Sequence, residues 1–214
     1  MTALPRRLVV CGTDTDVGKT VVSALLVQGL QASYWKPVQC GLEQGEGDRD
    51  RVQRWLQLPP QRVLPEAYRL SAPVSPHWAT ERAGVPAISE EQLAIPAVEG
   101  PLVVETAGGL LVPLRLDLLQ IEMLQSWALP VVLVARSGLG TLNHTLLSLE
   151  ALNRRQIPVA GVLLNGEPHP NNANTLQALA GVPVLGCLPP LARIDGPALQ
   201  QQWHALDLVH KLKA

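Results

Sequence analysis

The chain has few charged residues, and neither sign prevails. Charged side chains make up 16% of its 214 residues, and 17 basic against 18 acidic residues leave a formal net charge of -1. Because nucleic acids and anionic membranes attract basic proteins, this balance argues against both as partners. The composition therefore favours a small-molecule partner.

Cysteine is also scarce, with only Cys11, Cys40 and Cys187, which are far apart. An odd number at wide spacing fits reduced thiols better than disulfides, and no grouping of His, Cys and Asp has the spacing of a zinc site. The sequence also lacks Gly-x-Ser-x-Gly, so a hydrolase with a nucleophile elbow is unsupported. We interpret Cys11 and Cys187 as small buried apolar residues.

Long hydrophobic runs are missing as well. No apolar run approaches the roughly 20 residues that span a bilayer, and residues 1–7 lack the apolar segment of a secretory signal. We therefore expect a cytoplasmic protein. With 47% hydrophobic residues, residues 1–214 can bury one substantial core, so we expect a single domain.

Short apolar runs alternate with helical patterns along the chain. The runs are rich in valine and leucine, which is typical of parallel strands buried on both faces. They lie at 8–10, 34–35, 102–104, 131–134, 159–164 and 184–185, and apolar residues recur at helical spacing over 19–30, 48–57, 116–127, 141–155, 171–179 and 197–212. The alternation predicts an α/β fold, with a mainly parallel sheet and helices on both faces. Residues 59–101, interrupted by prolines, are predicted to form a long surface excursion with two short helices.

Residues 9–22 have the pattern of a phosphate-binding loop between a strand and a helix. They read VVCGTDTDVGKTVV, with Gly-Lys-Thr where the helix is expected to begin. In such a loop, backbone N–H groups cradle phosphate oxygens, the lysine reaches the outer phosphates and the threonine hydroxyl can hold Mg²⁺. Five residues separate Gly12 from Gly18, one more than in the common pattern, which indicates a variant class. The segment therefore predicts a nucleotide site around Lys19 and Thr20 in a P-loop NTPase-like fold.

Polar residues follow other predicted strands, at the sheet edge where parallel sheets bind ligands. Lys36 would add a second cation beside the phosphate loop, as phosphoryl transfer uses. Glu105 precedes small residues at 107–109 that let the backbone approach a ligand, and its carboxylate can bind Mg²⁺. Asp48 and Asp50 open a predicted helix. Either could be a third oxygen ligand, or both could simply cap the helix, and the spacing alone does not choose.

The phosphate loop itself contains two carboxylates, Asp14 and Asp16. They would repel a nucleotide unless their side chains turn away, so we expect structural or indirect roles for them. Thr13 and Thr15 can donate hydrogen bonds toward a substrate.

Five motifs, in their order along the chain, resemble the dethiobiotin synthetase family. They are GTDTDVGKT at 12–20, KPVQCG at 36–41, SPH at 75–77, VETAGG at 104–109 and GLGTLNH at 138–144, and the resemblance covers nearly the whole chain. It implies an ATP-dependent cyclo-ligase of biotin biosynthesis that converts 7,8-diaminononanoate and CO₂ into dethiobiotin, giving ADP and phosphate, with Mg²⁺ as cofactor. It also implies a homodimer in which the 138–144 turn and the following helix help to close the partner's substrate site.

The resemblance also implies roles for single residues. Lys36 would be the catalytic lysine, bridging the γ-phosphate and a substrate carbamate, and Lys19 would bind the ATP phosphates. Mg²⁺ would be held by Thr20, Asp50 and Glu105, because Asp50 fits the family's placement better than the other aspartate that opens the helix.

For the two ligands, the resemblance implies that Thr15 and Cys40 line the substrate, with Cys40 standing where the family commonly has serine. Asn165 would read the adenine, and residues 189–191 would pass beside the base. The complete predicted nucleotide-binding set is Asp16, Val17, Gly18, Lys19, Thr20, Val21, Asp50, Glu105, Thr106, Ala107, Gly108, Asn165, Gly166, Pro189, Pro190 and Leu191.

Three departures from the family pattern carry expectations. Thr106 replaces a frequent glycine and could crowd the substrate channel, and Gly166 replaces an acidic residue, which puts nucleobase selectivity in doubt. The segment between Lys19 and Lys36 is shorter than in the family, which should tighten the turn after the first helix.

Two other functions remain as alternatives. A ParA/MinD-like nucleotide switch shares this fold type, but it characteristically carries a second lysine early in the phosphate loop, where this chain has aspartates. An amidotransferase-type synthase would need an appended glutaminase domain, for which the chain has no room.

Overall fold

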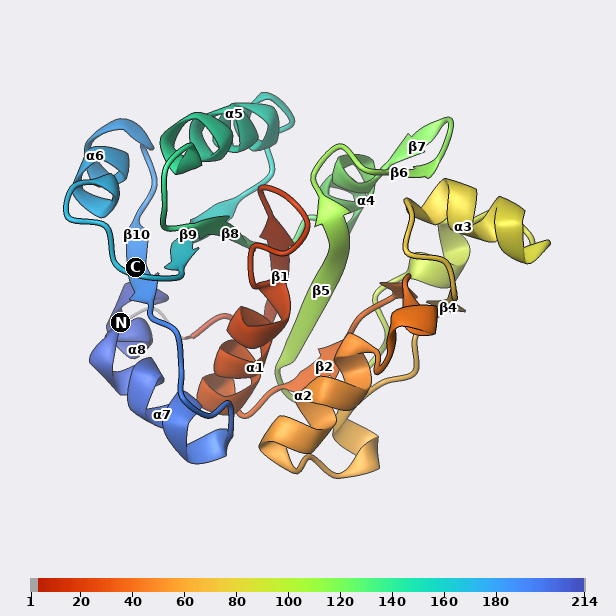
Figure 1. Ribbon diagram of the computed structural model, residues 1–214, viewed down its shortest axis with the longest axis horizontal. Helices are drawn as coiled ribbons and strands as arrows, with labels where there is room; N and C mark the ends of the chain where they lie inside the picture. The colour runs from red at the N-terminus through yellow and green to blue at the C-terminus, as the bar shows by residue number, and fades with distance from the viewer. Residues whose placement is uncertain (1–3, 214) are drawn as a thin grey trace.

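The computed structural model describes residues 4–213 and has a six-stranded sheet at its centre. The strand order is β10-β9-β8-β1-β5-β2, and every neighbouring pair is parallel (Figure 1). The strands are β1 (Arg7–Gly12), β2 (Ser33–Trp35), β5 (Leu102–Gly109), β8 (Val131–Arg136), β9 (Val159–Asn165) and β10 (Val184–Leu188). The predicted mainly parallel α/β fold is confirmed.

Alternate residues of each strand enter two separate hydrophobic cores, one on each face of the sheet. Leu8 and Val10 of β1 pack in the first core, whereas Val9 and Cys11 pack in the second. The helices whose side chains enter the first core are α1 (Lys19–Leu30), α2 (Asp48–Leu56), α7 (Gly196–Ala205) and α8 (Leu208–Lys211), and those of the second are α4 (Gln120–Trp127), α5 (Thr141–Arg154) and α6 (Asn172–Leu179). Because both faces are covered, the strands can be apolar throughout, as the sequence indicated.

Helix α1 begins and ends where the sequence predicted. Gly18 precedes it with a φ of 94°, and a Cβ at this position would lie 2.1 Å from the Asn165 amide nitrogen, so glycine is required on both counts. Gln31 ends the helix in the left-handed region at a φ of 52°. These two ends place Lys19 and Thr20 in the first turn of the helix.

The predicted helix over 116–127 is wrong in its first part. A hairpin of β6 (Pro113–Arg115) and β7 (Leu118–Leu119) comes first, and α4 begins only at residue 120. In the turn, Arg115 Nε donates to Asp117 Oδ1 at 2.6 Å, and the backbone N–H of Leu119 donates to Glu122 Oε2 at 2.6 Å, which stabilises the start of the helix. The predicted helix over 197–212 is likewise divided into α7 and α8, because Asp207 adopts a φ of 53° between them.

The excursion over 59–101 is more than a surface loop. It contains β4 (Tyr68–Arg69), which pairs in parallel with β3 (Val38–Gln39), one α-helix, α3 (Pro76–Ala83), and two 3-10 turns, so one of the two expected helices is an α-helix. A third 3-10 turn, Leu42–Gln44, precedes α2. Leu70, Ile88 and Leu93 of the excursion pack with Val38 and Ala107 in a third core. This packing fixes the excursion beside the carboxyl end of β5.

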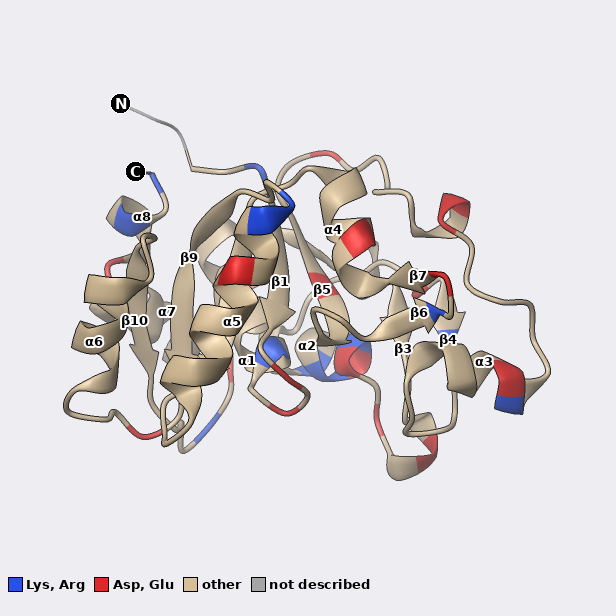
Figure 2. Ribbon diagram, turned by 90° about the horizontal axis from the view of Figure 1, so that it is seen from above, with Lys and Arg blue, Asp and Glu red and all other residues tan. Residues whose placement is uncertain are grey.

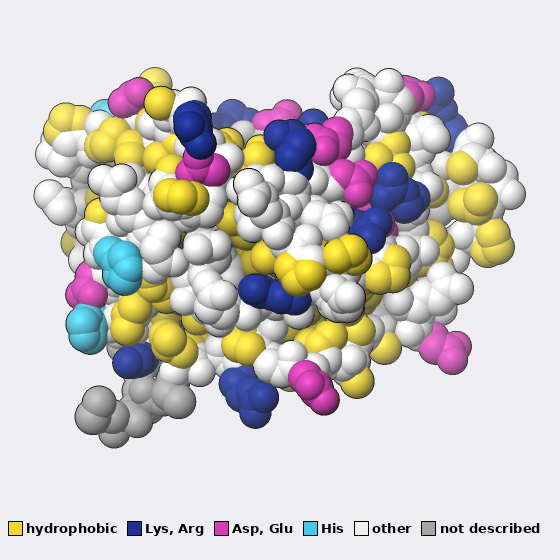
Figure 3. Space-filling view, turned by 90° about the horizontal axis from the view of Figure 1, so that it is seen from below, with side chains coloured by type: hydrophobic (Ala, Val, Ile, Leu, Met, Phe, Trp, Pro, Cys, Tyr) yellow, Lys and Arg dark blue, Asp and Glu magenta, His cyan; other side chains and the backbone are white. Residues whose placement is uncertain are grey.

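Charges are scattered over the ribbon without a run of one sign (Figure 2). The face seen from below mixes Lys and Arg with Asp and Glu among apolar side chains (Figure 3). Over residues 4–213, no helix combines the length and the apolar character that crossing a membrane demands.

Candidate active site

A cleft of about 800 Å³ opens at the carboxyl edge of the sheet, between the phosphate loop, α2 and the excursion. Its walls come from the loop and first turn of α1, from residues 36–48, from residues 73–76 and from the end of β5. The predicted site residues that line it are Thr15, Asp16, Gly18, Lys19, Thr20, Val21, Lys36, Cys40, Glu105, Ala107 and Gly108. The cleft therefore brings together residues of four separate sequence motifs.

At the bottom of the cleft, the carboxylate of Glu105 is completely buried and satisfied by three donors. Its Oε1 accepts from Lys36 Nζ at 3.0 Å and from the Thr20 hydroxyl at 2.9 Å, and its Oε2 accepts from the Tyr34 hydroxyl at 2.9 Å. A buried carboxylate is costly unless it is paired and hydrogen-bonded, and here β2 and α1 supply the partners. Glu105 lies inside β5 rather than in a loop after it, so its position is set by the strand ladder.

Lys36 is the centre of this network because it also pairs with the carboxylate of Asp48. Burial alone would lower the pKa of Lys36, but Glu105 and Asp48 outweigh it and hold the pKa above its usual value. Burial alone would raise the pKa of Asp48, yet Lys36 lowers it overall, with a smaller contribution from Thr20. The cluster therefore holds a protonated lysine beside the ionised carboxylate of Asp48.

Lys19 is the second buried cation of the cleft. Burial, reinforced by the charge of Lys36, lowers the pKa of Lys19, and Glu105 offsets part of this effect. Its Nζ donates to the backbone carbonyl oxygen of Asp14 at 2.8 Å, across its own loop. In the part of the chain that the structure describes, no side chain caps the start of α1, so the first N–H groups of the helix suit an anion.

The two aspartates of the loop are both exposed. The Asp14 carboxylate accepts from the backbone N–H of Thr15 at 2.7 Å and lies 3.6 Å from Arg136 Nη2, so it has partners of its own outside the cleft. Asp16 lines the cleft and adopts a φ of 57°.

Asp50, the aspartate that the resemblance favoured as a metal ligand, lies outside the cluster. Its carboxylate is 3.7 Å from Arg69 Nη2 and 3.9 Å from Arg49 Nη1. Successive helical residues are about 100° apart, so residues 48 and 50 of α2 point to nearly opposite sides. The structure thus places Asp48, and not Asp50, beside Lys36 and Thr20, and the prediction for Asp50 has no geometric support.

The residues predicted to contact the nucleobase do not line the cleft. Asn165 Nδ2 donates to the carbonyl oxygen of Val17 at 3.2 Å, so this amide supports the phosphate loop from behind. Gly166 has a φ of 125°, and a Cβ there would lie 2.7 Å from Ser137 Oγ. Residues 189–191 follow β10 and lead toward α7. Recognition of the base by these residues stays a prediction.

Thr106 does not crowd the cleft, contrary to the expectation from the family pattern. Successive side chains of a strand point to opposite faces, and Glu105 and Ala107 are the ones that face the cleft. The Thr106 side chain is buried on the other face of β5, where its hydroxyl has no hydrogen-bond partner among the residues that the structure describes.

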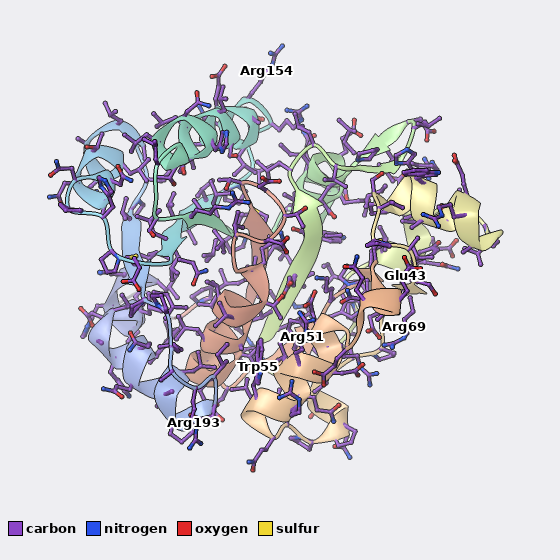
Figure 4. All side chains as sticks on the ribbon, viewed as in Figure 1. Glu43, Arg51, Trp55, Arg69, Arg154 and Arg193 are labelled. Carbon is purple, nitrogen blue, oxygen red and sulfur yellow. The ribbon has the colours of Figure 1, made fainter. Side chains whose placement is uncertain are left out.

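Sequence reasoning missed Tyr34 and several of the residues that line the cleft. Tyr34 was interpreted only as part of a strand, although a tyrosine in a buried strand needs a partner for its hydroxyl. Burial, with Glu105 next, raises the pKa of Tyr34 well above its usual value, which keeps the phenol a donor. Gln39, Arg51 and Trp55 also line the cleft, and the last two extend from the side of α2 that faces α1 (Figure 4).

Comparisons with known proteins agree on the family. The family described as "AAA domain" matches residues 6–198. ATP-dependent dethiobiotin synthetase BioD of Rhodopseudomonas palustris (strain BisB18) is 52% identical over 194 residues, which cover 91% of this chain and 92% of that protein. Its counterpart from Brucella anthropi is 48% identical over 196 residues and 92% of both chains.

Two further similarities are to a longer protein and to a solved structure with a similar fold. The biotin biosynthesis bifunctional protein BioCD of Bordetella avium (strain 197N) is 48% identical over 91% of this chain and 42% of that protein. A solved ParA family ATPase from Chlorobium tepidum TLS has a TM-score of 0.53 and 13% identity, covering 97% of this chain and 91% of that one, so the two share a fold. Several ATP-dependent dethiobiotin synthetases are about 50% identical to this chain over about 90% of its length. The chain therefore belongs to the ATP-dependent dethiobiotin synthetase family.

Proposed function

We propose that this chain converts 7,8-diaminononanoate, CO₂ and ATP into dethiobiotin, ADP and phosphate. The observation that carries the proposal is the convergence of Lys36, Thr20, Asp48 and Glu105 in one cleft, beside Lys19 of the phosphate loop. Phosphoryl transfer asks the protein mainly to align the attacking oxygen and to neutralise charge, and these side chains can do both.

The proposed reaction has three bond-forming steps. One amine of the substrate adds to CO₂ and loses a proton, which gives a carbamate. A carbamate oxygen then attacks the γ-phosphorus and ADP leaves, so that a carbamic–phosphoric anhydride forms. The second amine attacks the carbonyl carbon and loses a proton, phosphate leaves and the ureido ring closes.

Within this sequence, Lys36 acts as a fixed positive charge. Its raised pKa keeps the ammonium group protonated, so it stabilises the carbamate and the γ-phosphate electrostatically and does not serve as a base. Lys19 can release the Asp14 carbonyl oxygen and turn to the outer phosphates. Such charge stabilisation grows as the transition state forms, which is what raises kcat.

The oxygen donors of the cluster fit Mg²⁺. The Thr20 hydroxyl and the carboxylates of Asp48 and Glu105 are hard ligands of the kind that this ion prefers. The two carboxylates pair with Lys36, and the Thr20 hydroxyl donates to Glu105. We assign these three residues to the metal, with Asp48 in place of Asp50. When bound there, Mg²⁺ would neutralise charge on the phosphate oxygens.

Exposed apolar side chains on the 138–144 turn, on α5 and on the β6–β7 hairpin support the proposed homodimer. Leu139 of the 138–144 turn is fully exposed, and Leu147 on α5 and Leu116 of the β6–β7 hairpin are more than half exposed. Large exposed apolar side chains are commonly covered in a protein interface. The cytoplasm remains the predicted compartment.

The experiment that tests this function is product analysis by mass spectrometry. The protein is incubated with ATP, Mg²⁺, ¹³C-bicarbonate and 7,8-diaminononanoate, with the Lys36→Ala variant as control. We expect dethiobiotin that carries one ¹³C atom, formed only by the unsubstituted protein. Hydrolysis of ATP without dethiobiotin would contradict the proposal and favour a nucleotide switch.

A further inference from the structure

Arg51 on α2 is a cation of the cleft that the proposed reaction does not use. It follows Asp48 by one helical turn, and its Nη1 donates to Asp48 Oδ1 at 3.4 Å. The other oxygen of the same carboxylate, Oδ2, pairs with Lys36. The Arg51 side chain is 44% exposed, whereas that of Asp48 is 14% exposed, so Arg51 holds the carboxylate from the mouth of the cleft and Lys36 holds it from inside.

The backbone of Asp48 is held separately from its side chain. Its N–H donates to Gln39 Oε1 at 2.9 Å, and Gln39 Nε2 donates to the carbonyl oxygen of Cys40 at 2.8 Å. Gln39 thus fixes where α2 begins, but it leaves the carboxylate of Asp48 free to rotate. The direction of this carboxylate depends on its side-chain partners, which are Lys36, Thr20 and Arg51.

The contacts of Asp48 with Lys36 and with Arg51 are not equally compatible with the proposed reaction. In the proposed function, Lys36 must face the carbamate and the γ-phosphate, so its contact with Asp48 competes with catalysis. The contact of Arg51 involves only Oδ1, whereas Lys36, which also pairs with Glu105, holds Oδ2. It can therefore persist while Oδ2 binds a cation.

We propose that Arg51 is a positioning residue for the divalent cation of the nucleotide. Its guanidinium holds Oδ1 of Asp48, so that Oδ2 stays turned toward the inside of the cleft, where Lys36 and Glu105 lie. Partners of this kind orient the ligands of a metal and commonly change its affinity by about 10- to 100-fold. The inference rests on the proposed function, because it takes Asp48 as a ligand.

The test is the affinity of Mn²⁺ for the complex with a non-hydrolysable ATP analogue, measured by electron paramagnetic resonance of the free ion. Arg51→Met keeps the apolar stem and removes the guanidinium, and Arg51→Lys restores a charge. Arg54→Met is the matched control, because Arg54 lies on the same helix and pairs with the exposed Glu46. We expect the Mn²⁺ dissociation constant to rise about tenfold in Arg51→Met, to recover partly in Arg51→Lys and to stay unchanged in Arg54→Met.

A second measurement separates positioning of the metal from direct contact with the nucleotide. Binding of the same analogue in excess chelator should be equal in the unsubstituted protein and in Arg51→Met. An unchanged Mn²⁺ affinity in Arg51→Met would overturn the inference, and so would an equal loss of analogue binding without metal. Because Mn²⁺ binding needs no turnover, a failure to form dethiobiotin would count against the proposed function and leave the result for Arg51 standing.

Discussion

The two halves of the carboxyl edge of the sheet are built differently. At the β1, β2 and β5 half, charged side chains from three elements meet in one network around Lys36 and Glu105. At the β8, β9 and β10 half, Gly166 has no side chain and the Asn165 amide supports the backbone of the phosphate loop. Charge stabilisation in the first half therefore depends on single side chains, whereas the second half contributes mainly through its backbone. Substitutions should therefore have large effects in the first half and small effects in the second.

The largest effect is expected for Lys36→Ala. Removing this ammonium group should lower kcat by on the order of 100-fold or more, because its charge is used as the transition state forms. Binding of ATP should change far less. Steady-state kinetics and titration calorimetry measure the two quantities, and a thermal melt checks that the protein remains folded. A near-normal kcat in Lys36→Ala would show that Lys36 does not stabilise the transition state.

The next largest effect is expected on the Mg²⁺ requirement, where substitutions of two neighbouring aspartates are compared. Asp48→Asn should raise the Mg²⁺ concentration for half-maximal activity by about tenfold, since an amide oxygen carries less negative charge toward a hard cation. Asp50→Asn should change it less than about twofold, because this carboxylate faces Arg69 at an exposed site. Activity measured as a function of Mg²⁺ concentration for both variants shows which aspartate binds the metal. The reverse order would restore the ligand that the sequence favoured.

These two aspartates also mark where sequence reasoning stops. Local spacing was enough to predict the phosphate loop and both ends of α1, because glycine conformation and helix start act within a few residues. It did not choose between positions 48 and 50, since which side of α2 faces Thr20 depends on how α2 packs. Tyr34 was missed for the same reason, because its role arises from a contact between β2 and β5.

The β6–β7 hairpin shows a second limit. Its leucines recur at a spacing that also suits a helix, so periodicity predicted one continuous helix. The ion pair between Arg115 and Asp117 and the burial of Leu114 and Leu118 in the third core favour the hairpin instead. Tertiary contacts therefore decided this segment.

A smaller effect is expected in the other half of the edge. Asn165→Ala removes a hydrogen bond to the Val17 carbonyl oxygen, which is worth about 1 kcal/mol. The KM for ATP should rise about fivefold, and kcat should stay within about twofold. Initial rates over a range of ATP concentrations test this. A loss of kcat as large as that of Lys36→Ala would mean that the two halves are not separable.

The smallest effect is expected for Cys40, which lines the cleft beside Lys36. Burial raises the pKa of its thiol to about 11, and Lys36 only partly opposes this. The thiol is therefore protonated near pH 7, and alkylation by iodoacetamide should be slow there and rise about tenfold per pH unit toward pH 11. Mass spectrometry of the Cys40 peptide measures the rate, with Cys40→Ser as a control expected to keep its activity. Rapid alkylation of Cys40 at pH 7 would contradict its environment in the cleft.

The most direct test of the whole account is a crystal structure with a non-hydrolysable ATP analogue, Mg²⁺ and 7,8-diaminononanoate. The account predicts that Thr20, Asp48 and Glu105 bind the metal, and that Lys36 Nζ lies between the terminal phosphate and a substrate amine. Asp50 should still face Arg69. A metal bound to Asp50, or a Lys36 side chain directed away from both ligands, would contradict the account.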